Sequence, residues 1–293
     1  MQNKTGLGKA GPVMQQGYDL IGDVHGCGKT LIHLLEQMGY RKIKGVYQHK
    51  TRKVIFLGDI IDRGPNIRLA CETVYKMVEA GHADIIMGNH EYNLVTYMTP
   101  APEAMNQAYL RPHTKRNTFI VEQTLNQFSA YPEELKSYID WFVQIPIFKE
   151  YDNFRVVHAC WDQNLIDQFQ SRYGDNKLHR ALLAESVNAD GFLFKCLDRL
   201  LRGTSLKLPD NRSMTAKDGM VRQFFRTKFW ASRPSVYNDV VFQPDPLPED
   251  LGHRSLSEEE KQDLLFYKTS EKPLFFGHYW MTGVPEVIRS NIA

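Results

Sequence analysis

The chain has 293 residues, 42% of them hydrophobic, which is enough apolar material to bury a sizeable core. Its 36 basic and 34 acidic side chains leave a formal net charge of +2. So small a net charge creates no overall field that would attract nucleic acid or a membrane surface. If the substrate carried a phosphate, nearby side chains would have to bind it. The four cysteines lack CxxC spacing, which argues against a disulfide framework and a structural zinc site.

The sequence also contains no segment typical of membrane insertion or export. No uncharged apolar run approaches the roughly 18 residues that a membrane-spanning helix needs, and the first residues contain no apolar signal segment. The basic residues form no stripe of the kind that binds nucleic acid. We therefore expect a cytoplasmic protein whose partners are neither membranes nor nucleic acids.

The first regular elements follow a polar start. Residues 1–17 are rich in Gly, Gln and Lys and predict a flexible leader before a single domain over 18–293. Residues 18–21 predict a short strand. A helix should follow, because apolar side chains recur at helical spacing until Gly39. Those side chains are Leu31, Leu34, Leu35 and Met38.

The next elements repeat this alternation. Residues 53–57 (K-V-I-F-L) predict a second strand, and residues 83–87 predict a third. Between them lies a helical pattern that we expect Asn66 to cap and Gly81 to end. A strand, helix, strand, helix, strand order predicts an α/β fold with a largely parallel sheet and helices on its faces.

The second half of the chain is more varied. Pro132 is expected in the first turn of a helix, and a hairpin is expected around residues 152–153. A further helix is predicted over roughly 178–201. Residues 203–272 turn polar and predict surface excursions around the site, after which 273–278 predicts a buried strand.

Five apolar runs end in residues that bind metals. In open α/β sheets the carboxyl ends of the strands form the binding crevice, so we expect these side chains to meet. Carboxylates, an amide and imidazoles without a thiolate suit manganese, iron, zinc or magnesium. Two such ions bridged by an aspartate favour in-line displacement at phosphorus, which is phosphoester hydrolysis. The residues are Asp23 and His25, Asp59, Asn89 and His90, His158, and His278.

Three short blocks give these residues a family resemblance. G-D-V-H-G (22–26), G-D-I-I-D-R-G (58–64) and G-N-H-E (88–91) resemble the signature blocks of the calcineurin-like metallophosphoesterases. V-V-H-A (156–159) and F-G-H (276–278) resemble the later histidine blocks. The likeness is to the phosphoprotein-phosphatase branch, which includes Ser/Thr protein phosphatases and diadenosine tetraphosphate hydrolases. It implies the calcineurin-like fold, with central β-sheets flanked by helices and a metal site at the strand carboxyl ends.

The resemblance also implies a ligand set for two divalent ions. Asp23 and His25 would hold the first ion, and Asp59 would bridge both. The second ion would take Asp59 together with Asn89, His158 and His278. Manganese is the expected metal, with iron, zinc and magnesium as alternatives, and a metal-bridging hydroxide would be the nucleophile.

Catalytic and substrate-binding roles follow from the same resemblance. His90, paired with Asp62, would be the general acid for the leaving oxygen, because a carboxylate partner raises the pKa of an imidazole. Arg63 would bind phosphate oxygens bidentately, with Asn89 also at the substrate. The residues alone leave open that Arg63 is a surface arginine and that Asp62 only braces its loop. No motif places the second phosphate-binding arginine that is common in the protein phosphatases, and Arg222 or Arg226 is our hypothesis for it.

The substrate is less closely specified than the chemistry. We expect a phosphorylated small molecule, nucleotide or phosphoprotein, and favour diadenosine tetraphosphate-like nucleotides over the alternative of Ser/Thr or Tyr protein phosphatase activity. Trp161 and Trp280 follow the two late histidines, and their indoles either stack on a nucleobase, line the pocket or belong to the core.

A distant alternative comes from residues 19–31, which contain a glycine-rich turn ending in Gly-Lys-Thr. A nucleotide-binding P-loop needs four residues between its first glycine and the Gly-Lys-Ser/Thr end. Gly22 and Gly28 enclose five, so the P-loop hypothesis is weak. Lys29 is instead expected on the exposed start of the first helix.

Overall fold

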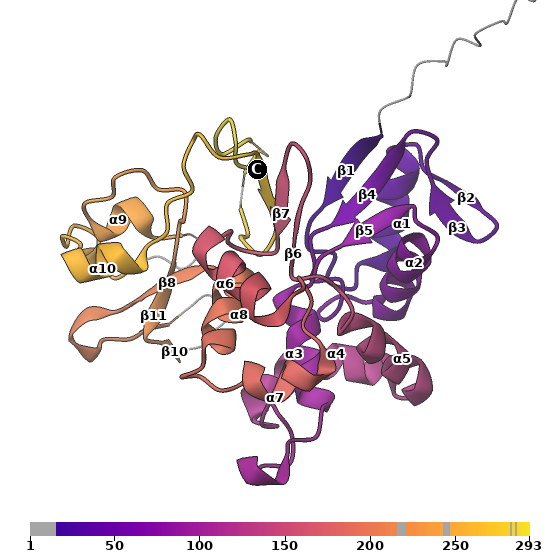
Figure 1. Ribbon diagram of the computed structural model, residues 1–293, viewed down its shortest axis with the longest axis horizontal. Coiled ribbons are helices and arrows are strands. Elements are labelled where there is room, and N and C mark those ends of the chain that lie inside the picture. The colour runs from indigo at the N-terminus through magenta and orange to yellow at the C-terminus, as the bar shows by residue number, and fades with distance from the viewer. Residues whose placement is uncertain (1–15, 216–220, 243–246, 282, 285) are drawn as a thin grey trace, which may run out of the picture.

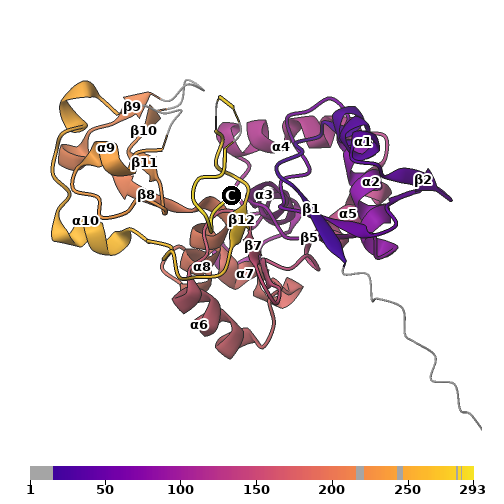
Figure 2. The same cartoon turned by 90° about the horizontal axis from the view of Figure 1, so that it is seen from above.

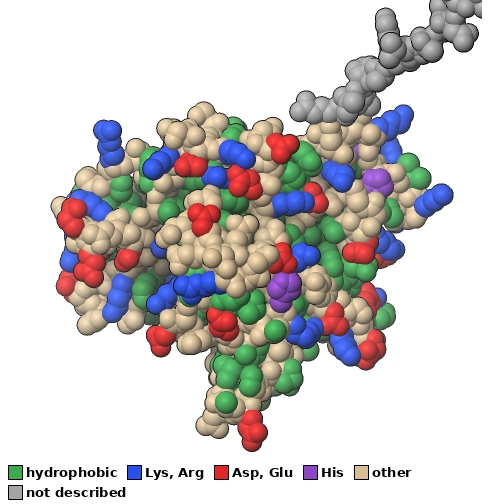
Figure 3. All heavy atoms as spheres, in the orientation of Figure 1, with side chains coloured by type: hydrophobic (Ala, Val, Ile, Leu, Met, Phe, Trp, Pro, Cys, Tyr) green, Lys and Arg blue, Asp and Glu red, His purple; other side chains and the backbone are tan. Residues whose placement is uncertain are grey.

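The computed structural model describes residues 16–215, 221–242, 247–281, 283–284 and 286–293 (Figure 1). The leader predicted at residues 1–17 lies outside this part of the chain except for its last two residues. No helix of the described part combines the length and the apolar character needed to cross a membrane. The face in Figure 3 intersperses basic and acidic side chains, as expected for a balanced net charge.

A parallel sheet forms the first layer. Its strands are β1 (Gly17–Ile21), β4 (Arg52–Phe56) and β5 (Ala83–Ile85), in that spatial order and all parallel. Helices α1 (Gly28–Gln37) and α2 (Ile67–Glu79) make the two crossovers. The predicted alternation of strands and helices is therefore confirmed for this part of the chain.

Details of these crossovers differ from the prediction. In α1 the buried face consists of Leu31 and Leu35, whereas Leu34 is 41% exposed. The prediction that Leu34 belongs to the apolar face is wrong because α1 buries only a narrow stripe, packed mainly on α2. A short antiparallel hairpin, β2 (Arg41–Ile43) with β3 (Val46–Gln48), also precedes β4.

The start of α2 is capped by a different residue than expected. Asn66 occupies the N-cap position, but its side chain makes no cap hydrogen bond. The backbone N–H of Ile67 instead donates to Oε1 of Gln127 at 2.7 Å, and Gln127 Nε2 donates to the carbonyl oxygen of Gly64 at 2.9 Å. A distant glutamine thus satisfies an orphan donor of the helix end, which local capping rules do not predict.

The middle of the chain is helical. Its helices are α3 (Asn89–Met98), α4 (Lys115–Phe128) and α5 (Pro132–Phe142), with a short 3₁₀ turn η1 (Glu103–Met105). Pro132 is the first residue of α5, as predicted. The predicted apolar face of α5 is also confirmed, since all its members are buried: Leu135, Tyr138, Ile139 and Phe142.

A second sheet packs against the first. Strands β6 (Phe148–Glu150) and β7 (Arg155–Val157) form the predicted antiparallel hairpin, and β12 (Leu274–Phe276) joins β7 in parallel. Side chains from both sheets form one apolar cluster, so the two sheets share a buried layer. Its buried members are Ile55, Leu57, Ile86, Phe154 and Val156.

The helix predicted over 178–201 is broken. Helix α6 (Gln163–Tyr173) comes first, followed by η2 (Arg180–Leu182), α7 (Leu183–Ser186) and α8 (Phe192–Arg202). The polar V-N-A-D-G stretch at 187–191 turns the chain, with the Gly191 N–H donating to the carbonyl oxygen of Asn188 at 2.9 Å. Side chains that compete for backbone hydrogen bonds favour such a turn over a continuous helix.

The region over 204–264 has an apolar core of its own, which we call the second core. Its members are Leu206, Leu208, Met214, Phe225, Tyr237, Val240, Val241, Leu251 and Leu256. The elements that supply and surround it are β8 (Thr204–Lys207), η3 (Pro209–Asn211), β9 (Met214–Thr215), β10 (Val221–Arg222), β11 (Phe224–Thr227), α9 (Tyr237–Val240), η4 (Glu249–Leu251) and α10 (Glu258–Asp263). Figures 1 and 2 both place this region on the far side of β7 and α8 from the first sheet. We predicted a single domain with surface excursions over residues 203–272. Because residues 216–220 and 243–246 lie outside the described part of the chain, this stays a prediction.

Candidate active site

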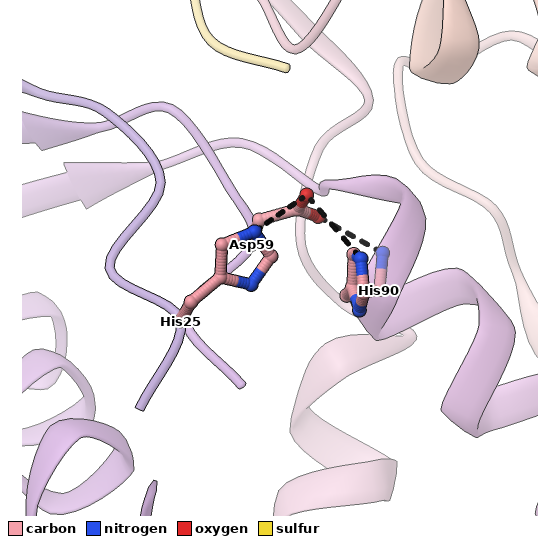
Figure 4. Close-up of side chains that lie close together, drawn as sticks. All are labelled: His25, Asp59 and His90. Carbon is pink, nitrogen blue, oxygen red and sulfur yellow. Dashed lines mark hydrogen bonds and ion pairs between the residues drawn. The ribbon is translucent and has the colours of Figure 1, made fainter. Parts of the chain in front are cut away.

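The polar side chains that follow the strands gather around Asp59. Ligand atoms of His25, Asp59 and His90 lie within 4.8 Å of one another, and so do those of Asp59, His158 and His278. Figure 4 shows His25 and His90 on either side of the Asp59 carboxylate. Asp59 belongs to both groups, which is the arrangement that one carboxylate needs to join two cation sites.

The turns that carry these side chains have unusual backbone angles. His25, Asp59 and His278 have φ values of 43°, 52° and 61°, and Asp62 and Arg63 have 67° and 64°. Residues other than glycine rarely adopt this left-handed region, at a cost of about 1–3 kcal/mol each. Such strain persists only where the surroundings fix the conformation, and here it directs side chains toward one point.

Glycines let the backbone approach these side chains closely. A Cβ atom at Gly88 would lie 2.2 Å from Oδ1 of Asp59, and one at Gly277 would lie 2.4 Å from Oδ1 of Asp23. A Cβ at Gly88 would also lie 2.4 Å from the backbone nitrogen of Asp59, so moving the carboxylate alone would not admit another residue there.

Asp59 is buried among imidazoles. Its Oδ2 lies 3.2 Å from Nε2 of His158, 3.8 Å from Nε2 of His25 and 4.0 Å from Nε2 of His90. Burial alone would raise the pKa of Asp59, but the charges of His158 and His90 hold it well below its usual value. The carboxylate is thus anionic and faces inward, as a bridging ligand must.

Backbone carbonyls orient two of the histidines. Nδ1 of His158 donates to the carbonyl oxygen of Leu57 at 2.6 Å, and Nδ1 of His25 donates to that of Ile61 at 3.0 Å. Since a carbonyl only accepts, these contacts fix the proton on Nδ1 and turn Nε2 toward Asp59. Nε2 of His158 also lies 3.2 Å from Oδ1 of Asn89. Burial would lower the pKa of His158, but the charge and hydrogen bond of Asp59 raise it to about 9.

Asp23 and His278 complete the arrangement. Oδ1 of Asp23 accepts the backbone N–H of His278 at 3.0 Å, and its Oδ2 lies 3.8 Å from Nε2 of His25. Nε2 of His278 is buried and has no hydrogen-bond partner among the residues that the structure describes. Burial and the charge of Arg226 hold the pKa of His278 well below its usual value, so this imidazole is neutral. A buried, neutral and unpartnered ring nitrogen fits a divalent cation, and so does the oxygen and nitrogen donor set.

A second set of contacts lies beside the ligands. Nδ1 of His90 is 2.6 Å from Oδ2 of Asp62, and Nη2 of Arg63 is 3.4 Å from Nε2 of His90. Thr124 braces Asp62, because its Oγ1 accepts the Asp62 N–H at 3.1 Å and its hydroxyl donates to Oδ1. Burial would lower the pKa of His90, but the charge of Asp59 and the Asp62 hydrogen bond raise it overall. His90 can therefore hold a proton near neutral pH.

Sequence reasoning missed the role of Glu91. Its Oε2 accepts the N–H groups of Asp59 at 2.8 Å and Gly88 at 3.0 Å, and its Oε1 accepts that of Ile60 at 2.8 Å. This buried carboxylate ties the turn after β4 to the start of α3. Burial and the charge of Asp59 raise its pKa to about 7. Its place in the G-N-H-E block was the only sequence signal.

The residues that the sequence left as alternatives have different surroundings. Arg226, in β11, donates from Nη1 to the carbonyl oxygen of His278 at 3.4 Å, whereas Arg222 pairs with Met214 in the β10–β9 ladder. Trp161 is a core residue, only 2% exposed. Trp280 is 62% exposed, and its ring centroid lies 5.6 Å from Cζ of Arg63.

Comparison of the sequence with known proteins identifies the family of the chain. The family model described as calcineurin-like phosphoesterase matches residues 19–278, which include every ligand discussed above. The chain belongs to the calcineurin-like phosphoesterase family. The resemblance and the fold class predicted from the motifs are thereby confirmed.

Curated relatives of this phosphoesterase share one description, bis(5'-nucleosyl)-tetraphosphatase PrpE, asymmetrical. The protein of Oceanobacillus iheyensis is 31% identical over 166 residues, which cover 54% of this chain and 64% of the relative. Those of Halalkalibacterium halodurans and Geobacillus sp. are 27% and 31% identical, each match covering 59% of this chain and 69% of the relative. The chain thus spans just under two thirds of the length of the Oceanobacillus relative.

Solved structures of phosphatases also resemble this phosphoesterase. A proposed diadenosine tetraphosphatase has a TM-score of 0.44 at 14% identity, covering 96% of this chain and 82% of that chain. A protein serine/threonine phosphatase from Saccharomyces cerevisiae has a TM-score of 0.36 at 15% identity, covering 51% and 40%. Since these TM-scores are low, the fold assignment rests on the family match.

The family defines the class of chemistry. The chain belongs to a family of phosphoesterases that depends on two metal ions, and two groups of its side chains could hold a metal ion. The P-loop hypothesis does not fit, because Lys29 is exposed at the start of α1 and Asp23 faces His25 and His278.

Proposed function

We propose that this phosphoesterase hydrolyses dinucleoside polyphosphates asymmetrically, so that water and a dinucleoside tetraphosphate yield a nucleoside monophosphate and a nucleoside triphosphate. The observation that carries the proposal is the single Asp59 carboxylate common to two groups of candidate ligand atoms, one with His25 and His90 and the other with His158 and His278. Arg63 lies beside His90. The relatives described as asymmetrical tetraphosphatases support the choice of substrate.

Two manganese ions are the proposed cofactor. Asp23, His25 and Asp59 would hold one ion, and Asp59 with Asn89, His158 and His278 would hold the other. Ions so held supply Lewis-acid polarisation of a phosphoryl oxygen and lower the pKa of bound water. Manganese suits this mixture of carboxylate, amide and imidazole ligands.

The remaining chemistry belongs to the side chains of the chain itself. We assign proton donation to the leaving phosphate oxygen to His90, with Asp62 fixing the ring through the 2.6 Å contact at Nδ1. Arg63 is exposed and so placed to bind phosphate oxygens from the solvent side. Asn89, whose Oδ1 lies 3.2 Å from Nε2 of His158, is the other proposed substrate contact. Arg226 is the proposed second phosphate-binding arginine, because it adjoins His278.

A substrate panel tests the proposal. The full chain is stripped of metal, reloaded with manganese, and assayed with diadenosine tetraphosphate, phosphopeptides and p-nitrophenyl phosphate. We expect the highest kcat/KM for diadenosine tetraphosphate, with AMP and ATP as equimolar products, and loss of turnover on adding a chelator. Two ADP molecules as products, or a higher kcat/KM for phosphopeptides, would contradict the proposed substrate. Ser/Thr or Tyr protein phosphatase activity stays a prediction that this panel tests. The cytoplasmic location expected from the sequence also stays a prediction, which this panel does not address.

A further inference from the structure

An indole is displayed beside the proposed phosphate-binding arginine. Trp280 is exposed, and Cζ of Arg63 lies 5.6 Å from its ring centroid, within the range of a cation–π contact. The same guanidinium lies 3.4 Å from Nε2 of His90. Arg63 therefore sits between the proposed proton donor and a flat aromatic surface open to solvent.

The neighbour of Trp280 fixes where the indole is displayed. Tyr279 is buried, and its ring packs edge-on against Phe229, Phe242 and Phe276. Its hydroxyl donates to the carbonyl oxygen of Thr227 at 3.3 Å and accepts the Thr204 N–H at 3.3 Å.

Gly203 makes this seat for Tyr279 available. A Cβ atom at Gly203 would lie 2.1 Å from the Tyr279 hydroxyl oxygen, so the position admits the phenol only as glycine. With Tyr279 held in the core, the next side chain along the chain is exposed. The backbone on which Trp280 stands is thus anchored, which limits the ordering cost when a ligand binds.

The pairing of indole and guanidinium matches one chemical class. A phosphate bound by Arg63 would bring the next part of its own molecule over Trp280, and a nucleotide carries a planar base at the distance of one ribose. Aromatic side chains bind bases by stacking without selecting among them, because every base has a π face.

We infer that Trp280 is a stacking platform for the nucleobase of the nucleotide whose phosphate Arg63 binds. This inference rests on the proposed function and names the feature that would let the enzyme prefer nucleotides to other phosphoesters. Trp280 is a specificity residue, separate from the ligands and from the proton donor.

A protein partner is the rival occupant of this surface. Met281, Val284 and Val287 are also exposed, and clustered apolar side chains can mark a docking surface. The nucleobase is favoured because Trp280 contacts Arg63, a proposed substrate-binding residue. Among the described contacts, the three apolar side chains make no such contact.

Two inhibitors that differ only in the base test the inference. AMP and ribose 5-phosphate share the phosphate and the ribose, so the ratio of their inhibition constants isolates the base. The ratio is measured against p-nitrophenyl phosphate hydrolysis by the manganese-loaded full chain. The variants are Trp280→Ala and Trp280→Phe, with Val287→Ala as the matched control in the same segment.

Stacking on one aromatic ring should make AMP bind about ten- to a hundredfold more tightly than ribose 5-phosphate to the wild type. We expect Trp280→Ala to bring the ratio near one, Trp280→Phe to keep most of it, and Val287→Ala to keep all of it. AMP should also quench indole fluorescence in the wild type but much less in Trp280→Phe.

A ratio unchanged by Trp280→Ala would overturn the inference, and so would a wild-type ratio near one. A loss in Trp280→Ala confined to phosphopeptide substrates would assign the surface to a protein partner instead. The proposed function fails separately: if the wild type releases no AMP and ATP from diadenosine tetraphosphate, the substrate is wrong whatever the inhibitor ratio.

Discussion

The first sheet and the second core are encoded by different sequence patterns. Around the first sheet, contiguous motifs place His25 and Asp59 in left-handed backbone conformations shortly after the ends of strands. The second core is assembled from isolated apolar residues in a mainly polar segment, and it sends Arg226 toward the site. The positions of the candidate ligands are therefore set by short backbone turns that sequence motifs predict. The region that flanks the site depends instead on contacts between residues far apart in the sequence.

Asp59→Asn should have the largest effect on the first region. An amide keeps the shape but loses the negative charge that four imidazoles surround, so hydrolysis of p-nitrophenyl phosphate should fall to the background rate. Circular dichroism should show an intact fold. Full activity in a folded Asp59→Asn protein would contradict the bridging role.

His90→Asn should come next. General acid catalysis contributes typically 10²–10⁴-fold, so kcat for an alkyl phosphate should fall by about that factor. The loss should be far smaller for p-nitrophenyl phosphate, because its leaving group hardly needs protonation. Equal losses with both substrates would argue against proton donation by His90.

Phe225→Ala tests whether the second core is a true core. Phe225 is 1% exposed, so its truncation should lower the free energy of unfolding by about 3–5 kcal/mol in urea titrations. Phe224→Ala is the matched control, because the adjacent side chain on β11 is 51% exposed and should cost less than about 0.5 kcal/mol. Similar losses for both variants would mean that the second core stabilises little.

The smallest expected effect is at the start of α2. Because the Asn66 side chain makes no cap bond, Asn66→Ala should change the free energy of unfolding by only a few tenths of a kcal/mol, below the usual cost of about 1 kcal/mol for a cap. Gln127→Ala removes the bonds to Ile67 and Gly64 and should cost about 1–3 kcal/mol. The reverse order in thermal or urea unfolding would restore Asn66 as the cap.

Local patterns predicted the elements whose residues are adjacent in sequence. The strands ending near Asp23 and Asp59, the α5 face and the hairpin before His158 all followed from short-range spacing. Local patterns failed for Leu34, whose exposure depends on how narrow the contact with α2 is. They failed again over 178–201, where turn-forming side chains broke an otherwise helical run.

The candidate site shows the same limit. The side chains that surround Asp59 were all named from the motifs. The backbone groups that Glu91 binds were not, because Asp59 and Gly88 belong to two segments about 30 residues apart. The Gln127 cap and the Thr124 brace likewise join residues about 60 positions apart. Such partners are determined by tertiary packing, which no periodicity or motif encodes.

The central claim is that Asp59 joins two cation sites, and counting bound manganese tests it most directly. Equilibrium dialysis of the metal-free chain against manganese, followed by electron paramagnetic resonance, should give two ions per chain with a spin-coupled signal. Asp59→Asn should lose that coupling. One ion per wild-type chain, or two ions without coupling, would contradict the account.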